Sequence, residues 1–118
     1  MIPKIFESEY KFCEILCENE PVSISELVRL CNERLEWKKS TTYTVIKRLT
    51  ERGVVKSEDA VVTSLVSREQ VQMAESAEVV ERSFAGSLPG FIAAFTKGKK
   101  LTSQEIQEIQ AIIDAHKE

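Results

Sequence analysis

Hydrophobic residues recur at helical spacing in the first third of the chain and predict two helices. The first runs from about Glu7 to Cys17, and Asn19-Glu20-Pro21 ends it. The second follows a capping box, in which Ser23 and Glu26 are expected to bond each other's backbone N–H groups. Its apolar positions keep the i, i+3, i+4, i+7 spacing of an amphipathic helix and are Ile24, Leu27, Val28 and Cys31.

A third helix is predicted from about Ser40 to Arg52. Val45, Ile46 and Leu49 form the stripe that this helix buries, and polar side chains occupy the rest of its surface. Gly53 follows at the position where helices commonly end on a left-handed residue.

Short β-like segments replace the helical pattern after the third helix. They cover Val54–Lys56 and Val61–Val66, and the polar residues Ser57-Glu58-Asp59 predict the turn between them. Three helices followed by a β-hairpin is the element order of a winged helix-turn-helix. Residues 1–67 are therefore predicted to form such a domain.

The remaining residues, 68–118, return to helical spacing. Arg68–Ser83 is predicted to form one helix. Gly86 and Pro89-Gly90 then interrupt the pattern, although Pro89 also suits the first turn of a following helix. Thr102 and Glu105 form a second capping box before the last helix. The predicted fold class is mainly α with a small β-hairpin wing, and a C-terminal helical region follows the winged helix.

The last helices carry more apolar surface than a region of this size buries by itself. We expect a second copy of the chain to cover it, because twofold dimers are the commonest homo-oligomers. Folding back onto the N-terminal domain is the alternative. The residues predicted to form the dimer surface are Leu88, Phe91, Ile92, Phe95, Leu101, Ile106, Ile109 and Ile113.

Charge adds a functional prediction to this fold. The chain of 118 residues has a net charge of −3, yet the segment from Arg29 to Lys56 contains eight Lys or Arg against three Asp or Glu. Lys and Arg neutralise phosphates, and Ser and Thr reach phosphates or base edges, so this basic island predicts DNA binding. The predicted DNA-contacting residues are Lys38, Lys39, Ser40, Thr41, Thr44, Lys47 and Arg48.

Other chemistry is sparse. Cys13 and Cys17 lie four apart and would share one face of a helix, so a metal- or redox-responsive function is an alternative to simple core packing. The single histidine, His116, has no catalytic motif around it, and neither an enzyme nor a bound metal or cofactor is expected.

No apolar run approaches the roughly 18 residues of a membrane span, and the N-terminus lacks a signal-peptide pattern, so we expect a cytoplasmic protein with no membrane contact.

Three segments together resemble the penicillinase-repressor family, which includes the methicillin-resistance and copper-operon repressors. Trp37…Ser40-Thr41…Thr44…Lys47-Arg48-Leu49…Gly53 is similar to the family's recognition-helix signature. Ser83–Leu88 resembles its dimerisation segment, and Leu101–Ile106 its closing helix. The resemblance implies a homodimeric winged-helix repressor that binds a palindromic double-stranded DNA operator, with each recognition helix in a major groove. It implies Ser40, Thr41, Thr44 and Arg48 as DNA contacts, Trp37 as a packing residue, and a sensor protease as a candidate partner.

The chain also departs from that family pattern. Lys38-Lys39 stands where relatives carry Ser-Pro, and the predicted wing carries the acidic pair Glu58-Asp59. Ala94-Phe95 occupies the position of the Asn-Phe bond that is cut in β-lactam-sensing relatives, and the Cys-x-Cys array of copper-responsive members is missing. The resemblance therefore implies neither a β-lactam nor copper as the inducing signal. Because winged helices also serve as protein–protein modules, that function is a further alternative.

Overall fold

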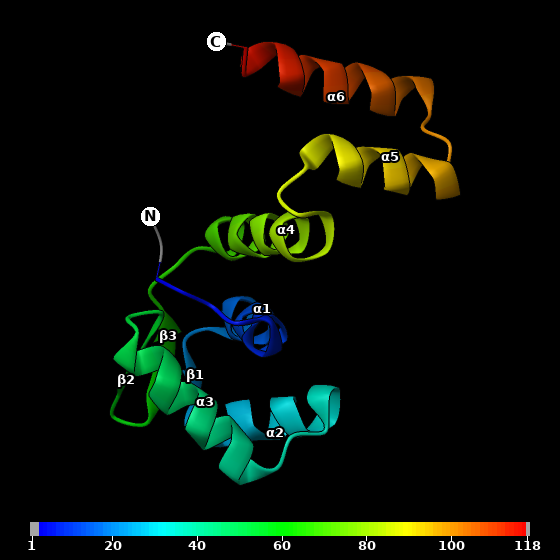
Figure 1. Ribbon diagram of the computed structural model, residues 1–118. Coiled ribbons are helices and arrows are strands. Elements are labelled where there is room, and N and C mark those ends of the chain that lie inside the picture. Colours follow the sequence, from blue (N-terminus) through cyan, green and yellow to red (C-terminus); the bar gives the residue numbers. More distant parts are fainter. Residues whose placement is uncertain (1–2, 118) are drawn as a thin grey trace. The chain divides into compact units, whose positions relative to one another are not determined.

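The computed structural model describes residues 3–117, which form two compact units (Figure 1). The first unit ends at Glu78 and the second begins at Val79, so the boundary falls inside a helix. The functional division predicted after residue 67 stays a prediction, because compactness does not say which residues bind DNA or a second copy.

The first unit has the element order of a winged helix-turn-helix. Its elements are η1 (Glu7–Glu9), α1 (Tyr10–Asn19), β1 (Val22–Ser23), α2 (Ile24–Leu35), α3 (Lys39–Glu51), β2 (Val55–Glu58), β3 (Val61–Ser64) and the first part of α4 (Arg68–Phe84). The predicted mainly helical fold with a small hairpin is confirmed.

The sheet has three antiparallel strands in the order β1-β3-β2. β2 and β3 pair from Val55↔Ser64 to Glu58↔Val61 and form the hairpin, which is called the wing from here on. β1 pairs with the other edge of β3. β1 was not predicted, because its two residues are too few to show the alternating pattern of a strand.

The turn of the wing lies at Asp59-Ala60, so the predicted turn at Ser57-Glu58-Asp59 was right at Asp59 and wrong at Ser57 and Glu58. Asp59 and Ala60 have left-handed backbone angles, with φ of 51° and 61°. Two-residue hairpin turns use this conformation because its twist matches that of the strands. Ser57 and Glu58 belong to β2 and pair with β3. Polar residues on an exposed strand resemble turn residues in the sequence, which explains the error.

An aliphatic core joins the three helices to the sheet. Phe12 and Leu16 of α1, Leu27 of α2, Leu49 of α3 and Val62 of β3 are all fully buried. Burying one large apolar side chain stabilises a fold by roughly 1.5–3 kcal/mol, so these contacts fix the inner side of each helix.

The first turns of α4 belong to the same unit. Val71 is buried in the common core, and Ala74 packs against it. Tyr10 donates a 2.6 Å hydrogen bond from its hydroxyl to the carboxylate of Glu78. These contacts attach α4 to α1.

Two predicted helix ends can be compared with the structure. Ser23 Oγ accepts a 3.2 Å hydrogen bond from the N–H of Glu26, which confirms that Ser23 caps α2. The carboxylate of Glu26 pairs with Arg29 rather than completing the predicted box. Gly53 follows α3 with φ of 79°, as predicted, where a side chain would be strained.

Arg52, the residue after α3, holds the N-terminal segment in place. Its guanidinium pairs with the carboxylate of Glu9, donates a 2.7 Å hydrogen bond to the backbone oxygen of Lys4, and lies 4.7 Å from the ring centroid of Phe6. Glu9 is only 3% exposed and also accepts a 2.8 Å hydrogen bond from the N–H of Phe6. A buried carboxylate needs such partners, so Arg52 is engaged within the first unit.

The second unit consists of the end of α4 and two further helices, α5 (Leu88–Gly98) and α6 (Ser103–Ala115). Ala85 and Gly86 separate α4 from α5 and both have positive φ. Pro89 lies in the first turn of α5, so only the break at Gly86 is present.

Both helices of the second unit begin with a side-chain cap. Ser87 Oγ accepts a 3.0 Å hydrogen bond from the N–H of Gly90 at the start of α5. The predicted capping box of α6 is confirmed, with Thr102 Oγ1 accepting from the N–H of Glu105 at 3.0 Å and the Glu105 carboxylate accepting in return at 2.9 Å. Within residues 3–117, no helix has both the length and the apolar character needed to cross a bilayer.

The ion pair of Arg52 gives a stability prediction. Arg52→Ala leaves the carboxylate of Glu9 buried without its cation, so we expect the free energy of unfolding to fall by about 3 kcal/mol. Urea unfolding at one fixed protein concentration measures this change.

Arg29→Ala is the matched control. Arg29 pairs with Glu26 and Glu33 on the exposed surface of α2, where ion pairs contribute little. Its removal should lower the stability far less than Arg52→Ala does. Equal losses for the two variants would contradict the structural role given to Arg52.

Candidate nucleic-acid interface

Helix α3 has one buried and one exposed side. Thr42, Val45, Ile46 and Leu49 are buried, which confirms the predicted apolar stripe and adds Thr42 to it. Every residue predicted to contact DNA is exposed on α3 or at its N-cap: Lys38, Lys39, Ser40, Thr41, Thr44, Lys47 and Arg48. The structure therefore brings this whole set to one helix.

Four of the eight basic residues of the island form ion pairs with acidic residues of the same chain. Arg29 pairs with Glu26 and Glu33, Arg34 with Glu18, Arg52 with Glu9, and Lys56 with Glu58. The pair of Arg34 and Glu18 is close, at 2.8 Å, and lowers the pKa of Glu18 through its hydrogen bond. A phosphate has to compete with the carboxylate for such a cation, and each simple pair presents a net charge close to zero to a partner.

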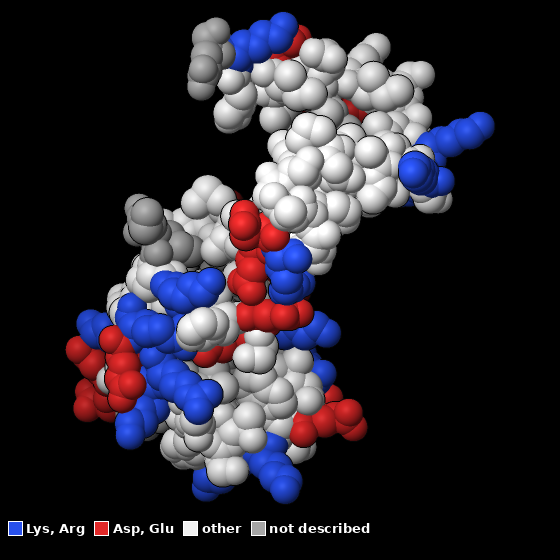
Figure 2. Space-filling model, in the orientation of Figure 1, with Lys and Arg blue, Asp and Glu red and all other residues white. Residues whose placement is uncertain are grey.

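The other half is free of acidic partners. Among residues 3–117, no ion pair forms to Lys38, Lys39, Lys47 or Arg48, and these four residues are called the unpaired cations from here on. All four lie on α3 or at its N-cap. Lys and Arg side chains gather over α3 in Figure 2. The positive charge that the island offers to a partner is thus concentrated on one helix.

Hydroxyl groups lie between these cations on the N-terminal half of α3. Thr44 donates a 2.9 Å hydrogen bond from its hydroxyl to the backbone oxygen of Ser40, which orients the side chain. The N-cap residue, Lys38, makes no side-chain cap bond, so the N–H groups of Lys39 and Ser40 are uncapped, whereas the N–H of Thr41 donates a 3.0 Å hydrogen bond to the backbone oxygen of Lys38. Donors and acceptors of this kind bind phosphate oxygens and base edges.

The connection between α2 and α3 is held by Trp37. Its ring stacks on Phe12, with the ring centroids 6.0 Å apart and the planes 8° apart. The backbone oxygen of Trp37 accepts a 3.1 Å hydrogen bond from the side chain of Asn32. Trp37 therefore packs at the start of α3, as the sequence predicted, and helps to fix the direction of that helix.

Comparison with known proteins identifies this architecture. A family model described as penicillinase repressor matches residues 5–115. The chain belongs to the penicillinase repressor family. Its members are transcription regulators and not enzymes, so the chain is a DNA-binding transcriptional repressor, as the sequence predicted.

Individual relatives agree with this assignment. The penicillinase repressor of Bacillus licheniformis is 21% identical over 120 residues, which cover 98% of this chain and 94% of that protein. A solved structure of Staphylococcus aureus MarR in complex with salicylate and kanamycin has a TM-score of 0.53 and 13% identity, and the match covers 94% of this chain and 70% of the MarR chain. At that identity the likeness concerns the fold alone.

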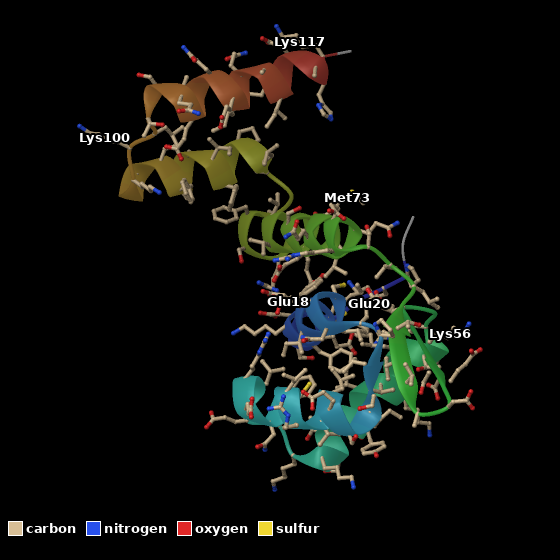
Figure 3. The ribbon with its side chains drawn as sticks, turned by 180° about the vertical axis from the view of Figure 1, so that it is seen from behind. Glu18, Glu20, Lys56, Met73, Lys100 and Lys117 are labelled. Atoms are coloured by element: carbon tan, nitrogen blue, oxygen red, sulfur yellow. The ribbon has the colours of Figure 1, made fainter. Side chains whose placement is uncertain are left out.

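The wing of this repressor has no free positive charge. Lys56, which Figure 3 shows on the hairpin, lies 3.2 Å from the carboxylate of Glu58. Asp59 at the turn is exposed and adds a negative charge. The wing therefore differs electrostatically from α3, and phosphates would be repelled by its tip.

The thiols of Cys13 and Cys31 are buried and that of Cys17 is half-buried, and none of the three has a lowered pKa. Burial raises the pKa of Cys13 to about 12, and burial also raises the pKa values of Cys17 and Cys31. Cys13 and Cys17 line a cavity of about 100 Å³ between α1 and α4. Thiolates are the reactive and metal-binding form, so raised pKa values disfavour the metal- or redox-responsive alternative. No cluster of three or more His, Cys, Asp or Glu that could hold a metal occurs in the described part of the chain.

The residues predicted to form a dimer surface lie in the second unit of the repressor. Leu88, Ile92 and Phe95 on α5 are 57%, 43% and 51% exposed, and Ile106 and Ile113 on α6 are 52% and 51% exposed. The other three residues of the predicted dimer surface, Phe91, Leu101 and Ile109, are half-buried. These apolar side chains leave a large surface exposed to solvent, which monomeric proteins rarely do.

Two features of the interface were missed in the sequence. The pairing of Arg52 with Glu9 joins residues 43 apart, so no local spacing reveals it. Tyr43 was counted neither with the buried stripe nor with the DNA contacts, yet it is 44% exposed on α3. Its helical position, two residues before Val45, could have shown that it lies outside the stripe, because side chains two apart on a helix do not face the same way.

Proposed function

We propose that this repressor binds a palindromic DNA operator as a homodimer, with α3 of each protomer in a major groove. The observation that carries the proposal is the concentration of all four unpaired cations on α3. A helix of this kind matches the major groove in width, and its exposed side chains reach both phosphates and base edges.

One group of side chains on α3 and at its N-cap would bind phosphates, and another would contact base edges. Lys38, Lys39 and Lys47 carry flexible point charges, which suit phosphate neutralisation. Thr41, Thr44 and Arg48 are exposed together and suit base edges, since a guanidinium can bond both acceptors of a guanine. Affinity would come mainly from the first group and sequence preference from the second.

A dimer is supported by the apolar side chains of α5 and α6. A second copy would cover Leu88, Phe95 and Ile113, which are otherwise in contact with water. Dimerisation would also bring two copies of α3 to one duplex, and the spacing of the half-sites would follow from the twofold symmetry.

A protein–protein role is the second candidate, and the wing favours it. Glu58 and Asp59 repel phosphates, so the wing would face a protein partner more readily than DNA. A sensor protease is a candidate protein partner of the second unit. Ala94-Phe95 lies in α5, so a protease acting at that bond would act on the proposed dimer surface.

Arg48 tests the reading function of α3. Arg48→Ala should weaken binding to an operator-like duplex, enriched from a random library, by roughly 1–3 kcal/mol and relax the preference at one base pair per half-site. Arg29→Ala removes the same type of side chain from the island, but Arg29 is already paired with Glu26 and Glu33. It should leave both affinity and preference unchanged in the same mobility-shift assay.

Lys39→Ala provides the contrast within α3. It should weaken binding to enriched and random duplexes alike and make the salt dependence shallower by about one phosphate contact per protomer. If Arg48→Ala bound the enriched duplex as tightly as wild type, the role of Arg48 would be contradicted. If Arg29→Ala and Lys39→Ala had identical effects, the distinction between paired and unpaired cations would be contradicted.

Phe95 tests the dimer. Phe95→Glu places a carboxylate on the proposed apolar surface, so we expect the dissociation constant of the dimer to rise roughly a hundredfold or more. Ala93→Glu is the matched control, because Ala93 is exposed on the opposite side of α5. Sedimentation velocity measures both variants, and a dimer unaffected by Phe95→Glu would contradict the proposed surface.

A further inference from the structure

An exposed aromatic side chain lies in the middle of the proposed DNA-binding helix. Tyr43 is 44% exposed, whereas the neighbouring Thr42 is completely buried. The side chains that stack on other rings in the first unit are Phe12 and Trp37, so Tyr43 is not part of that cluster. Burial in the core therefore does not account for a tyrosine at this position.

Tyr43 is placed between two of the unpaired cations. Lys39, Tyr43 and Lys47 are four residues apart along α3, and side chains at this spacing are neighbours on a helix. The Lys39 ammonium lies 5.7 Å from the centroid of the Tyr43 ring. The three residues form one edge of the exposed side of α3, and Thr41 and Arg48 lie on the other edge.

The tyrosine hydroxyl is also available. Among residues 3–117, the Tyr43 hydroxyl has no hydrogen-bond partner, whereas that of Tyr10 is bonded to Glu78. The ring presents an apolar surface and the hydroxyl a donor, with an ammonium group on either side. A ligand that matches this edge has an apolar group next to negatively charged oxygen atoms.

The wall of a DNA major groove has this combination at thymine. The C5-methyl group of thymine is the apolar feature of the major groove, and the phosphates of the same strand lie beside it. We infer that Tyr43 is a specificity-determining residue that selects thymine. This inference rests on the proposed binding of α3 in a major groove. Its ring contacts the C5-methyl group, and its hydroxyl donates to a neighbouring phosphate oxygen, while Lys39 and Lys47 bind the phosphates on either side.

A purely local role for Tyr43 gives a different expectation. If the ring only holds Lys39 by a cation–π contact, its removal weakens binding to every duplex alike and does not depend on thymine. A role in base selection makes the loss depend on one methyl group of the DNA. Removing that methyl group from the DNA, rather than only the side chain from the protein, separates the two roles.

The experiment uses the full chain and a duplex enriched from a random library. Each thymine of that duplex is replaced in turn by uracil, which lacks the C5-methyl group, and binding is measured for wild type, Tyr43→Ala and Tyr43→Phe. We expect uracil at one position per half-site to weaken wild-type binding roughly fourfold, the effect of exposing one methyl group. Tyr43→Ala should bind the thymine duplex roughly tenfold more weakly and should be insensitive to that uracil.

The remaining arms distinguish failure of this inference from failure of the proposed function. Tyr43→Phe keeps the ring, so it should keep the sensitivity to uracil and lose only part of the affinity. Met73→Ala is the control, because Met73 is a large side chain that is 61% exposed on α4 (Figure 3). Equal sensitivity of wild type and Tyr43→Ala to every uracil overturns the inference while α3 still binds DNA. Absence of any enriched duplex with wild type overturns the proposed function itself.

Discussion

Hydrophobic packing of α3 against the rest of the first unit is the constraint on which the proposed interface depends. Val45, Ile46 and Leu49 are buried in the core formed with α1, α2 and the sheet. Because an α-helix advances by 100° per residue, burial of this stripe fixes the direction of every other side chain on α3. The cations and hydroxyls of α3 face solvent together for that reason. Trp37 on Phe12 and Arg52 on Glu9 hold the two ends of the same helix.

Ion pairing then decides how much of the basic island is available to a partner. Arg29, Arg34, Arg52 and Lys56 are each held by an acid of the same chain, and within residues 29–56 the cations left unpaired are those of α3 and its N-cap. This selection matters in a protein with a net charge of −3, since the surface as a whole does not attract DNA. Acidic partners away from α3 leave the positive charge where base edges can also be read.

The sequence predicted the elements well and the long-range contacts poorly. Periodicity located α2, α3 and α6 because each buries a stripe that repeats within one helix, and the Thr102–Glu105 capping box was visible because its two residues are three apart. β1 and the wing turn were missed or misplaced because two-residue features leave no periodic signal. The whole predicted set from Lys38 to Arg48 is exposed on one helix, but a charge count could not show that Arg52 is engaged by Glu9. That knowledge requires the tertiary structure.

The salt dependence of duplex binding by the unmodified protein tests the central claim most directly. If the four unpaired cations of each protomer neutralise one phosphate each, a dimer on a palindromic duplex neutralises eight, and the slope of log K against log salt concentration is about −7. A slope near zero would show that phosphate contacts do not drive binding. A slope of about −14 would show that all eight basic residues of the island bind phosphates, which contradicts the division between paired and unpaired cations.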